Sequence, residues 1–126
     1  MEMQNIRFLA VDDSPTMRRI IVNTLKRIGF NNISEASNGK EALAKIYSEK
    51  VDFVITDWNM PEMNGLELIK AIKTDDSLKN LPILMVTTRG VKDDIVEAMK
   101  AGVSSYIVKP FSPQTLKEKI EQILKS

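Results

Sequence analysis

The sequence predicts an α/β fold in which one doubly wound, five-stranded parallel sheet is flanked by five helices. Short apolar, β-branched runs alternate five times with longer segments of helical period. The runs FVIT and ILMV are continuously apolar, as expected for strands that are buried on both faces. Regular alternation of this kind favours a parallel sheet with helices on both sides. No linker or change in composition divides the chain, so we expect residues 1–126 to form a single domain.

In chain order, the strands are expected at residues 6–11, 32–36, 51–56, 82–87 and 104–108. The first helix is expected to open at Ser14-Pro15, where Ser suits the N-cap and Pro the first turn, and to end at Gly29. Its apolar residues recur at helical spacing and predict an inward stripe of Met17, Ile20, Ile21, Thr24, Leu25 and Ile28.

The other four helices carry comparable signals. Asn38 with Glu41 looks like a capping pair for the second helix, and Asn64 with Glu67 repeats the pattern for the third. The fourth helix is expected to close near Gly102, and Ser112-Pro113 to open the fifth. In chain order, the predicted apolar positions of these helices are Leu43 and Ile46; Leu66, Ile69 and Ile72; Val91, Ile95, Ala98 and Met99; and Leu116, Ile120, Ile123 and Leu124.

The composition excludes several classes of chemistry. Lys and Arg number 18 against 17 Asp and Glu, so we expect neither nucleic acid nor an anionic membrane as a partner. The absence of cysteine excludes disulfides and zinc–sulfur sites, and the absence of histidine removes the commonest general base. No stretch suits a membrane span or a signal peptide, so a cytoplasmic location without membrane insertion is expected. Chemistry must use carboxylates, hydroxyls and amines.

Polar residues follow four of the five predicted strands. Asp12-Asp13 follows the first, Asp57 the third and Lys109 the fifth, and the fourth ends at Thr87-Thr88. In doubly wound sheets the working groups gather beyond the carboxyl ends of the strands. Singly, each residue has an ordinary explanation as a helix cap, a turn residue or a solvent-seeking lysine. Their arrival at one sheet edge is more informative than any one of them.

The chemistry of these groups indicates a metal-assisted phosphoryl site. Three carboxylates in one pocket repel unless a cation lies among them, and oxygen ligands alone favour Mg²⁺, with Mn²⁺ or Ca²⁺ as competitors. Lys109 adds a fixed positive charge, so a phosphoryl group on Asp57 would lie between two cations. Thr87 can donate a hydrogen bond to a phosphoryl oxygen. Asp57 is the predicted acceptor because it ends the central apolar strand.

Four dispersed stretches, VDDSPTMRR, ITDWNMPEMNG, ILMVTT and YIVKPF, resemble the receiver domains of two-component response regulators in order and spacing. The likeness covers residues 6–124 and is greatest with the CheY-like chemotaxis regulators. It implies a flavodoxin-like receiver fold with strand order 2-1-3-4-5, an order that is carried over from the family. It also implies a signalling protein that promotes its own aspartate phosphorylation and dephosphorylation, rather than an enzyme.

The resemblance assigns roles to individual residues. Asp57 would be phosphorylated, and Mg²⁺ would be bound directly by Asp13, Asp57 and the backbone carbonyl of Asn59, with Asp12 acting mostly through water. Lys109 would pair with the phosphoryl group and precede a cis Lys109–Pro110 bond. The remaining two roles belong to the switch, in which the Thr87 hydroxyl moves toward the phosphoryl oxygen and the Tyr106 rotamer follows it.

The resemblance also implies partners. A chemotaxis histidine kinase would supply the phosphoryl group, and the flagellar motor switch protein FliM would receive the signal from a monomer. Arg89 departs from the acidic residue that well-known chemotaxis members carry two positions after Thr87. The expected partner surface, which an ordinary solvated edge would also resemble, lies on the fourth helix, fifth strand and fifth helix at Lys92, Ile95, Val96, Tyr106, Val108 and Lys119.

Other functions fit the sequence less well. A haloacid-dehalogenase-type phosphatase needs a second Asp two residues after its nucleophile, where this chain has Asn59, and it needs a cap domain. A flavodoxin-like binder needs a Ser/Thr/Gly-rich loop after the first strand, and the P-loop pattern is absent. Within the receiver family, a phosphorelay intermediate or the receiver part of a DNA-binding regulator remains open. Because no second domain follows, we expect output through protein binding.

Overall fold

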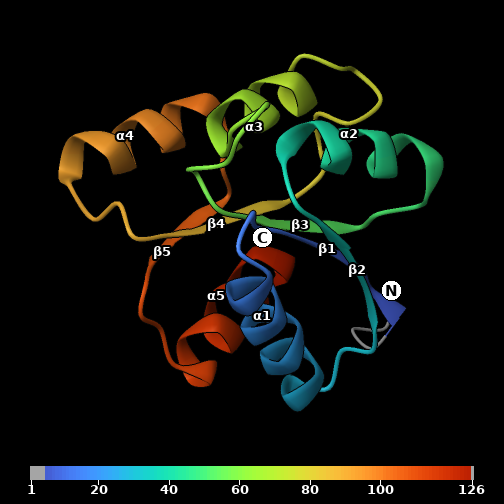
Figure 1. The fold of residues 1–126 in the computed structure, drawn as a ribbon, viewed down its shortest axis with the longest axis vertical. Helices are drawn as coiled ribbons and strands as arrows, with labels where there is room; N and C mark the ends of the chain where they lie inside the picture. The colour runs from blue at the N-terminus through green and yellow to red at the C-terminus, as the bar shows by residue number, and fades with distance from the viewer. Residues whose placement is uncertain (1–4, 126) are drawn as a thin grey trace.

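The computed structural model describes residues 5–125 and shows one sheet of five parallel strands in the order β2-β1-β3-β4-β5 (Figure 1). The predicted fold and the strand order implied by the resemblance are both confirmed. The strands are β1 (Arg7–Val11), β2 (Asn32–Ala36), β3 (Phe53–Thr56), β4 (Ile83–Thr87) and β5 (Ser105–Val108). The helices are α1 (Pro15–Ile28), α2 (Gly39–Ser48), α3 (Gly65–Lys73), α4 (Lys92–Ala101) and α5 (Pro113–Lys125).

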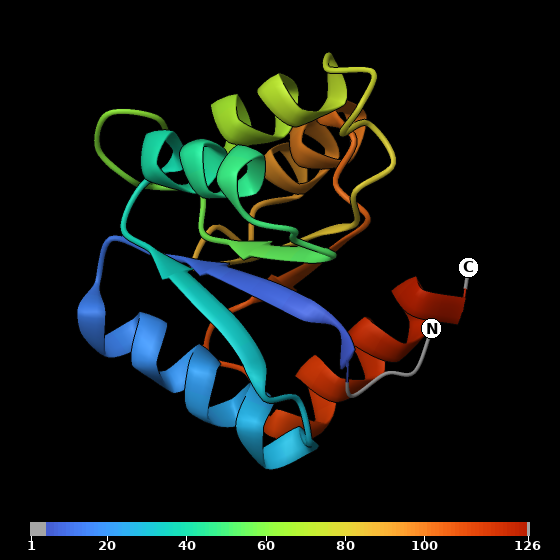
Figure 2. The same cartoon turned by 90° about the vertical axis from the view of Figure 1, so that its right-hand side faces the viewer.

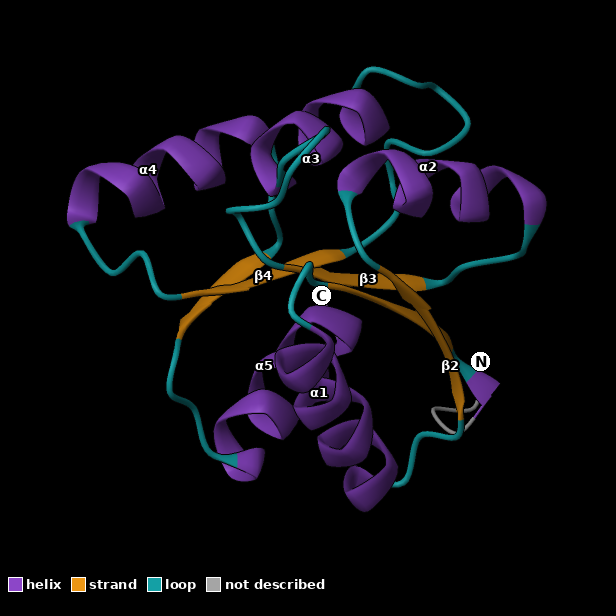
Figure 3. Cartoon of the chain, in the orientation of Figure 1, coloured by secondary structure: helices purple, strands orange, loops and turns teal. Residues whose placement is uncertain are grey.

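Helices cover both faces of the sheet. Figures 2 and 3 show α2, α3 and α4 on one side and α1 and α5 on the other. Side chains alternate along β1, so Leu9 and Val11 enter the core under α2, α3 and α4, whereas Phe8 and Ala10 enter the core against α1 and α5. Strands β3 and β4 are buried along their whole length, as their continuous apolar runs predicted.

All five strands end where the sequence predicted, but four of them begin one or two residues later. Ile6 is buried without belonging to the strand, because the apolar run extends beyond the hydrogen-bonded ladder. Pro82 has no N–H to donate, so β4 begins at the next residue. The strand ends matter more for function, since they position the polar residues.

The helix boundaries follow the predicted caps. The Ser14 side chain accepts a hydrogen bond from the Met17 N–H at 3.2 Å, and α1 ends at Gly29, whose φ of 122° favours glycine. Asn64 and Glu67 form a complete capping box at α3. The pair at α2 is only half of one, because the Glu41 carboxylate binds the Ser37 N–H instead of the Asn38 backbone.

Two helices bury fewer of the predicted residues than expected. In α1, Ile20 is 44% exposed while Val22, which the predicted stripe omitted, is buried. In α4, Val91 is the N-cap and is 64% exposed, and Met99 is 47% exposed. These predictions were wrong because the width of a buried stripe depends on the neighbouring elements, and α4 packs at the side of the sheet against α3 and β5. None of the helices within residues 5–125 has the length and apolar character needed to cross a membrane.

Candidate functional site

Three carboxylates meet at the carboxyl ends of β1 and β3. Asp12 and Asp13 follow β1, Asp57 follows β3, and one oxygen from each lies within 4.8 Å of the others. The two strands are parallel neighbours, so their carboxyl ends lie at the same edge of the sheet. Asp12 is buried, Asp57 is half-buried and Asp13 is exposed. The cluster therefore has a closed side at Asp12 and an open side at Asp13.

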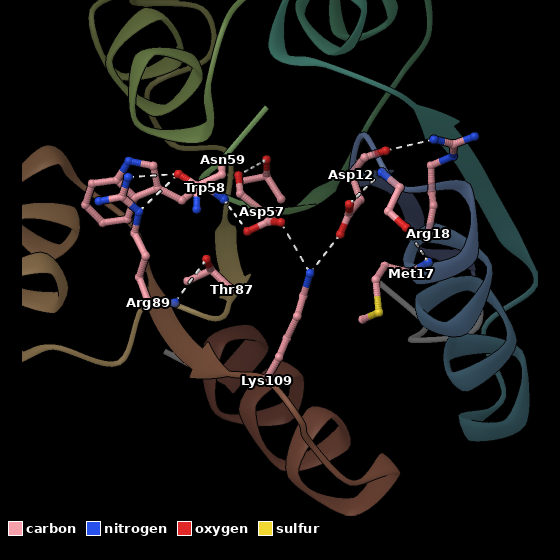
Figure 4. A network of polar contacts seen from close by, with 11 residues as sticks. Asp12, Met17, Arg18, Asp57, Trp58, Asn59, Thr87, Arg89 and Lys109 are labelled. Atoms are coloured by element: carbon pink, nitrogen blue, oxygen red, sulfur yellow. Dashed lines mark hydrogen bonds and ion pairs between the residues drawn. The ribbon is translucent and has the colours of Figure 1, made fainter. Parts of the chain in front are cut away.

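Lys109 reaches this cluster from the end of β5. Its Nζ lies 2.9 Å from Oδ2 of Asp12 and 3.3 Å from Oδ2 of Asp57 (Figure 4). The side chain is only 8% exposed, so its charge depends on these two partners. The Lys109 N–H donates to the Thr87 carbonyl at 2.8 Å, and the following Lys109–Pro110 bond is cis, as the resemblance implied. Lys109 thus bridges the two acidic residues whose side chains are not exposed.

Asp57 is held by its own backbone surroundings as well. Its Oδ1 accepts a hydrogen bond from the Trp58 N–H at 2.6 Å, and its N–H donates to the Val11 carbonyl at 3.0 Å. Gly65, the first residue of α3, packs directly on the Asp57 backbone. A Cβ at Gly65 would lie 2.0 Å from the Asp57 carbonyl oxygen, so only glycine allows this close approach. The start of α3 is therefore built around the end of β3.

Asp12 and Asp13 differ sharply in their contacts. Each oxygen of Asp12 has a donor: the carbonyl binds Arg18 Nη1 at 2.7 Å, Oδ1 binds the Ser14 N–H at 2.9 Å, and Oδ2 binds Lys109. Within residues 5–125, the Asp13 carboxylate has no hydrogen-bond or ion-pair partner. Asp12 is consequently a fixed part of the site, whereas the Asp13 carboxylate is available as a ligand.

The donor set fits a hard divalent cation. Three carboxylates against the single Lys109 ammonium leave an excess of two negative charges, which one divalent ion would balance. All the candidate ligand atoms are oxygens, as Mg²⁺ prefers. Mg²⁺ also retains several waters and therefore needs few protein ligands, which suits a cluster with an exposed side. The chemistry of the residues is thus consistent with the predicted metal.

Thr87 and Tyr106, the two predicted switch residues, both bind the backbone of Arg89. Thr87 is fully buried, and its hydroxyl accepts a hydrogen bond from the Arg89 N–H at 3.4 Å. The Tyr106 hydroxyl donates to the Arg89 carbonyl at 2.6 Å. Burial raises the pKa of Tyr106 to about 12, with the charges of Asp94 and Asp57 adding to the rise and Arg89 opposing it. The phenol is therefore a protonated donor at neutral pH.

The Arg89 side chain connects the loop after β3 to α4. Nε and Nη2 donate to Oδ1 of Asn59 at 3.1 and 2.8 Å, and the guanidinium lies over the Trp58 ring, 4.4 Å from its centre. Nη1 lies 3.6 Å from Oδ2 of Asp94 in α4. The sequence identified Arg89 only as a departure from the family. Trp58 and Asn59 lie far from Arg89 in the chain and meet it because β3 and β4 are neighbours, whereas Asp94 is close to it in sequence.

Sequence reasoning also missed the role of Arg18, whose contact with Asp12 is visible in Figure 4. The only local signal was a basic residue one helical turn after the N-cap Ser14, a position at which surface arginines are common. Its second partner, Glu35, lies at the end of β2, with Nε–Oε1 at 3.0 Å. This contact required the knowledge that β2 lies beside β1.

The residues of the predicted partner surface belong to α4, β5 and α5, and both helices contact β5. Val96 and Val108 are 39% and 40% exposed, which is high for apolar side chains. Of the remaining residues, Lys92 is exposed, and Ile95, Tyr106 and Lys119 are half-buried. Their use as a docking surface stays a prediction.

Comparison with known proteins identifies relatives over nearly the whole chain. A family model described as the response regulator receiver domain matches residues 8–121. A chemotaxis protein CheY homologue from Campylobacter jejuni is 55% identical over 122 residues, covering 94% of this chain and 92% of the relative. Chemotaxis protein CheY1 from Helicobacter pylori is 53% identical over 120 residues, covering 94% of this chain and 97% of the relative. One chain of a solved CheX–CheY–BeF₃–Mg²⁺ complex from Borrelia burgdorferi is similar to this chain with a TM-score of 0.88 and 26% sequence identity. The match covers 94% of this chain and 89% of that chain.

Proposed function

The chain belongs to the response regulator receiver family as a CheY-like regulator of chemotaxis, and from this premise we propose that Asp57 accepts a phosphoryl group from a histidine kinase. The observation that carries the proposal is the position of the Asp57 carboxylate. It lies between the Lys109 ammonium and a carboxylate cluster that has the ligand chemistry of a magnesium site. We further propose that the protein acts as a cytoplasmic monomer consisting of one receiver domain.

In the proposed transfer, a carboxylate oxygen of Asp57 attacks the phosphorus atom of the donor phosphohistidine. The phosphorus–nitrogen bond breaks, and its electron pair stays on the imidazole nitrogen. Lys109, within 3.3 Å of the acceptor carboxylate, offsets the charge of the incoming group, and the Trp58 N–H fixes the orientation of the carboxylate. A bound Mg²⁺ would further neutralise the phosphoryl oxygens. We assign it to Asp13, Asp57 and the Asn59 carbonyl, with Asp12 acting mostly through water.

The proposed switch uses the Arg89 backbone, to which Thr87 and Tyr106 are both hydrogen-bonded. If the Thr87 hydroxyl moves to a phosphoryl oxygen, it gives up the 3.4 Å contact with the Arg89 N–H. The loop that also holds the Tyr106 hydroxyl then becomes free to shift. Tyr106 belongs to the predicted surface of α4, β5 and α5, so this shift would change the binding of FliM.

The direct test is phosphorylation by a small-molecule donor. Wild-type protein with Mg²⁺ and acetyl phosphate should gain the mass of one phosphoryl group, and Asp57→Asn should gain none. Trp58 adjoins Asp57, so millimolar Mg²⁺ should change its fluorescence, and the phosphodonor should change it again only when Asp57 is present. Absence of phosphoryl mass on the wild-type protein would overturn the proposal.

The output is tested separately with the N-terminal segment of FliM. We expect more of the regulator to be retained on this segment with the phosphodonor than without it, and no gain for Asp57→Asn. A regulator that is phosphorylated on Asp57 but shows no gain would instead support the relay alternative, in which the phosphoryl group passes to another histidine protein.

A further inference from the structure

We propose that Arg18 is a positioning residue for the metal and phosphoryl site, and that it acts through the backbone of Asp12. The inference rests on the proposed function, because it concerns how the same carboxylates are held. Arg18 lies in the first turn of α1, and its side chain is 19% exposed. Neither its charge nor its position is used in the transfer described above.

The guanidinium of Arg18 joins three elements of the fold. Nη1 donates to the Asp12 carbonyl at 2.7 Å, and Nε donates to Oε1 of Glu35 at 3.0 Å. The backbone carbonyl of Glu35 in turn accepts a hydrogen bond from Lys45 of α2. The backbone of Arg18 is therefore fixed within α1, and its guanidinium is fixed by Glu35 of β2. From this position it binds the Asp12 carbonyl in the turn after β1 (Figure 4).

The contact with the Asp12 carbonyl has a direct consequence for Asp13. A peptide unit is planar, so the direction of the Asp12 carbonyl also fixes the N and Cα atoms of Asp13. The Asp13 carboxylate has no partner of its own among the described residues. Its placement toward Asp57 therefore depends on the backbone, and Arg18 is the side chain that holds this backbone carbonyl.

A positioning role and a purely electrostatic role predict opposite changes. Loss of a positive charge near the three carboxylates makes the site more negative, which by itself strengthens Mg²⁺ binding. Loss of the hydrogen bond to Asp12 lets the Asp12–Asp13 turn relax, which weakens Mg²⁺ binding. The direction of the change in Mg²⁺ affinity therefore separates the two roles.

The experiment measures Mg²⁺ binding by calorimetry and by Trp58 fluorescence at constant ionic strength. It compares the wild-type protein with Arg18→Met, which keeps the apolar stem, and with Arg18→Lys, which keeps the charge. Arg19→Met is the matched control, because Arg19 is the next residue of α1, is exposed and has no described partner. Arg18→Met should weaken binding about tenfold, the size typical of residues that orient metal ligands. Arg19→Met should leave binding unchanged or slightly stronger, and Arg18→Lys should be intermediate.

The outcomes are distinguishable. Mg²⁺ binding by Arg18→Met that equals the wild type, exceeds it, or matches Arg19→Met overturns the inference while leaving the proposed function intact. A wild-type protein that neither binds Mg²⁺ nor gains a phosphoryl group overturns both. Urea unfolding without Mg²⁺ identifies loss of fold. If Arg18→Met does not fold, Arg18→Lys decides: weaker binding than wild type supports the inference, and wild-type affinity overturns it.

Discussion

The helices α3 and α4 lie side by side on the same face of the sheet, yet they are anchored very differently (Figure 1). Each follows a strand with a candidate site residue at its end, since Asp57 comes directly after β3 and Thr87 is the last residue of β4. Helix α3 buries Leu68, Ile69 and Ile72 completely and begins with a full capping box. Helix α4 buries only Ala98, and its N-cap residue provides no side-chain hydrogen bond.

This difference indicates which element can respond to a change at the site. Movement of α3 would expose several large apolar side chains, at about 25 cal/mol for each Å² exposed. Movement of α4 would expose far less, because Val96 and Met99 already face solvent. The ion pair between Arg89 and Asp94 is partly exposed and therefore adds little. Low local stability of this kind is typical of elements that transmit signals.

The largest expected effect concerns the glycines that precede or begin the two helices. Gly65→Ala should cost about 4 kcal/mol of unfolding free energy, because the new Cβ would overlap the Asp57 carbonyl oxygen. At Gly90 a Cβ would approach only the Val108 side chain, at 3.3 Å, so Gly90→Ala should change stability by less than about 0.5 kcal/mol. Urea unfolding of both variants measures the contrast, and equal effects would contradict it.

Side-chain truncation in the two helices should show the next largest contrast. Ile72→Ala in α3 removes a fully buried side chain and should cost about 3 kcal/mol. Met99→Ala in α4 truncates a side chain that is 47% exposed and should change the unfolding free energy by less than about 0.5 kcal/mol. The same urea titrations apply. A cost at Met99 close to that at Ile72 would mean that α4 is anchored as firmly as α3.

A smaller effect is expected at the helix caps. Asn64→Ala removes the capping box of α3 and should cost about 1 kcal/mol. Val91→Ser adds a capping hydroxyl where α4 has none, and should stabilise the protein by about 0.5 kcal/mol. Amide hydrogen exchange should show the gain as slower exchange within α4 and not within α3. Unchanged exchange in α4 would show that its N-terminus is already satisfied in another way.

The fold and the acidic cluster were predictable because both depend on local patterns. Continuous apolar runs marked the buried strands, and the residues that follow them necessarily reach one edge of a parallel sheet. The contacts of Arg18 with Glu35 and of Arg89 with Trp58 and Asn59 were not predictable, because they join segments that are distant in sequence and meet only through the order of the strands. The exposure of Ile20, Val91 and Met99 was missed for a related reason, since helical spacing does not tell how wide the covering surface is.

The last effect is a pH dependence on the α4 side of the site, which appears only at high pH. Burial, assisted by Asp94 and Asp57, raises the pKa of Tyr106 to about 12, whereas a tyrosine in the unfolded chain has a pKa of about 10. The folded state therefore favours the neutral phenol. Its contribution to stability is complete below about pH 10 and is lost as the pH rises through about 12.

Phenolate absorbance should accordingly show that Tyr106 ionises at higher pH than free tyrosine, with Tyr47→Phe used to remove the signal of the other tyrosine. The Asp75 hydrogen bond raises the pKa of Tyr47 as well, so this control is necessary. In Tyr106→Phe, the loss of stability between about pH 10 and pH 12 should be smaller than in the wild type. Ionisation of Tyr106 at the ordinary tyrosine value would mean that its phenol is not buried near Asp94 and Asp57 in solution as it is in the structure.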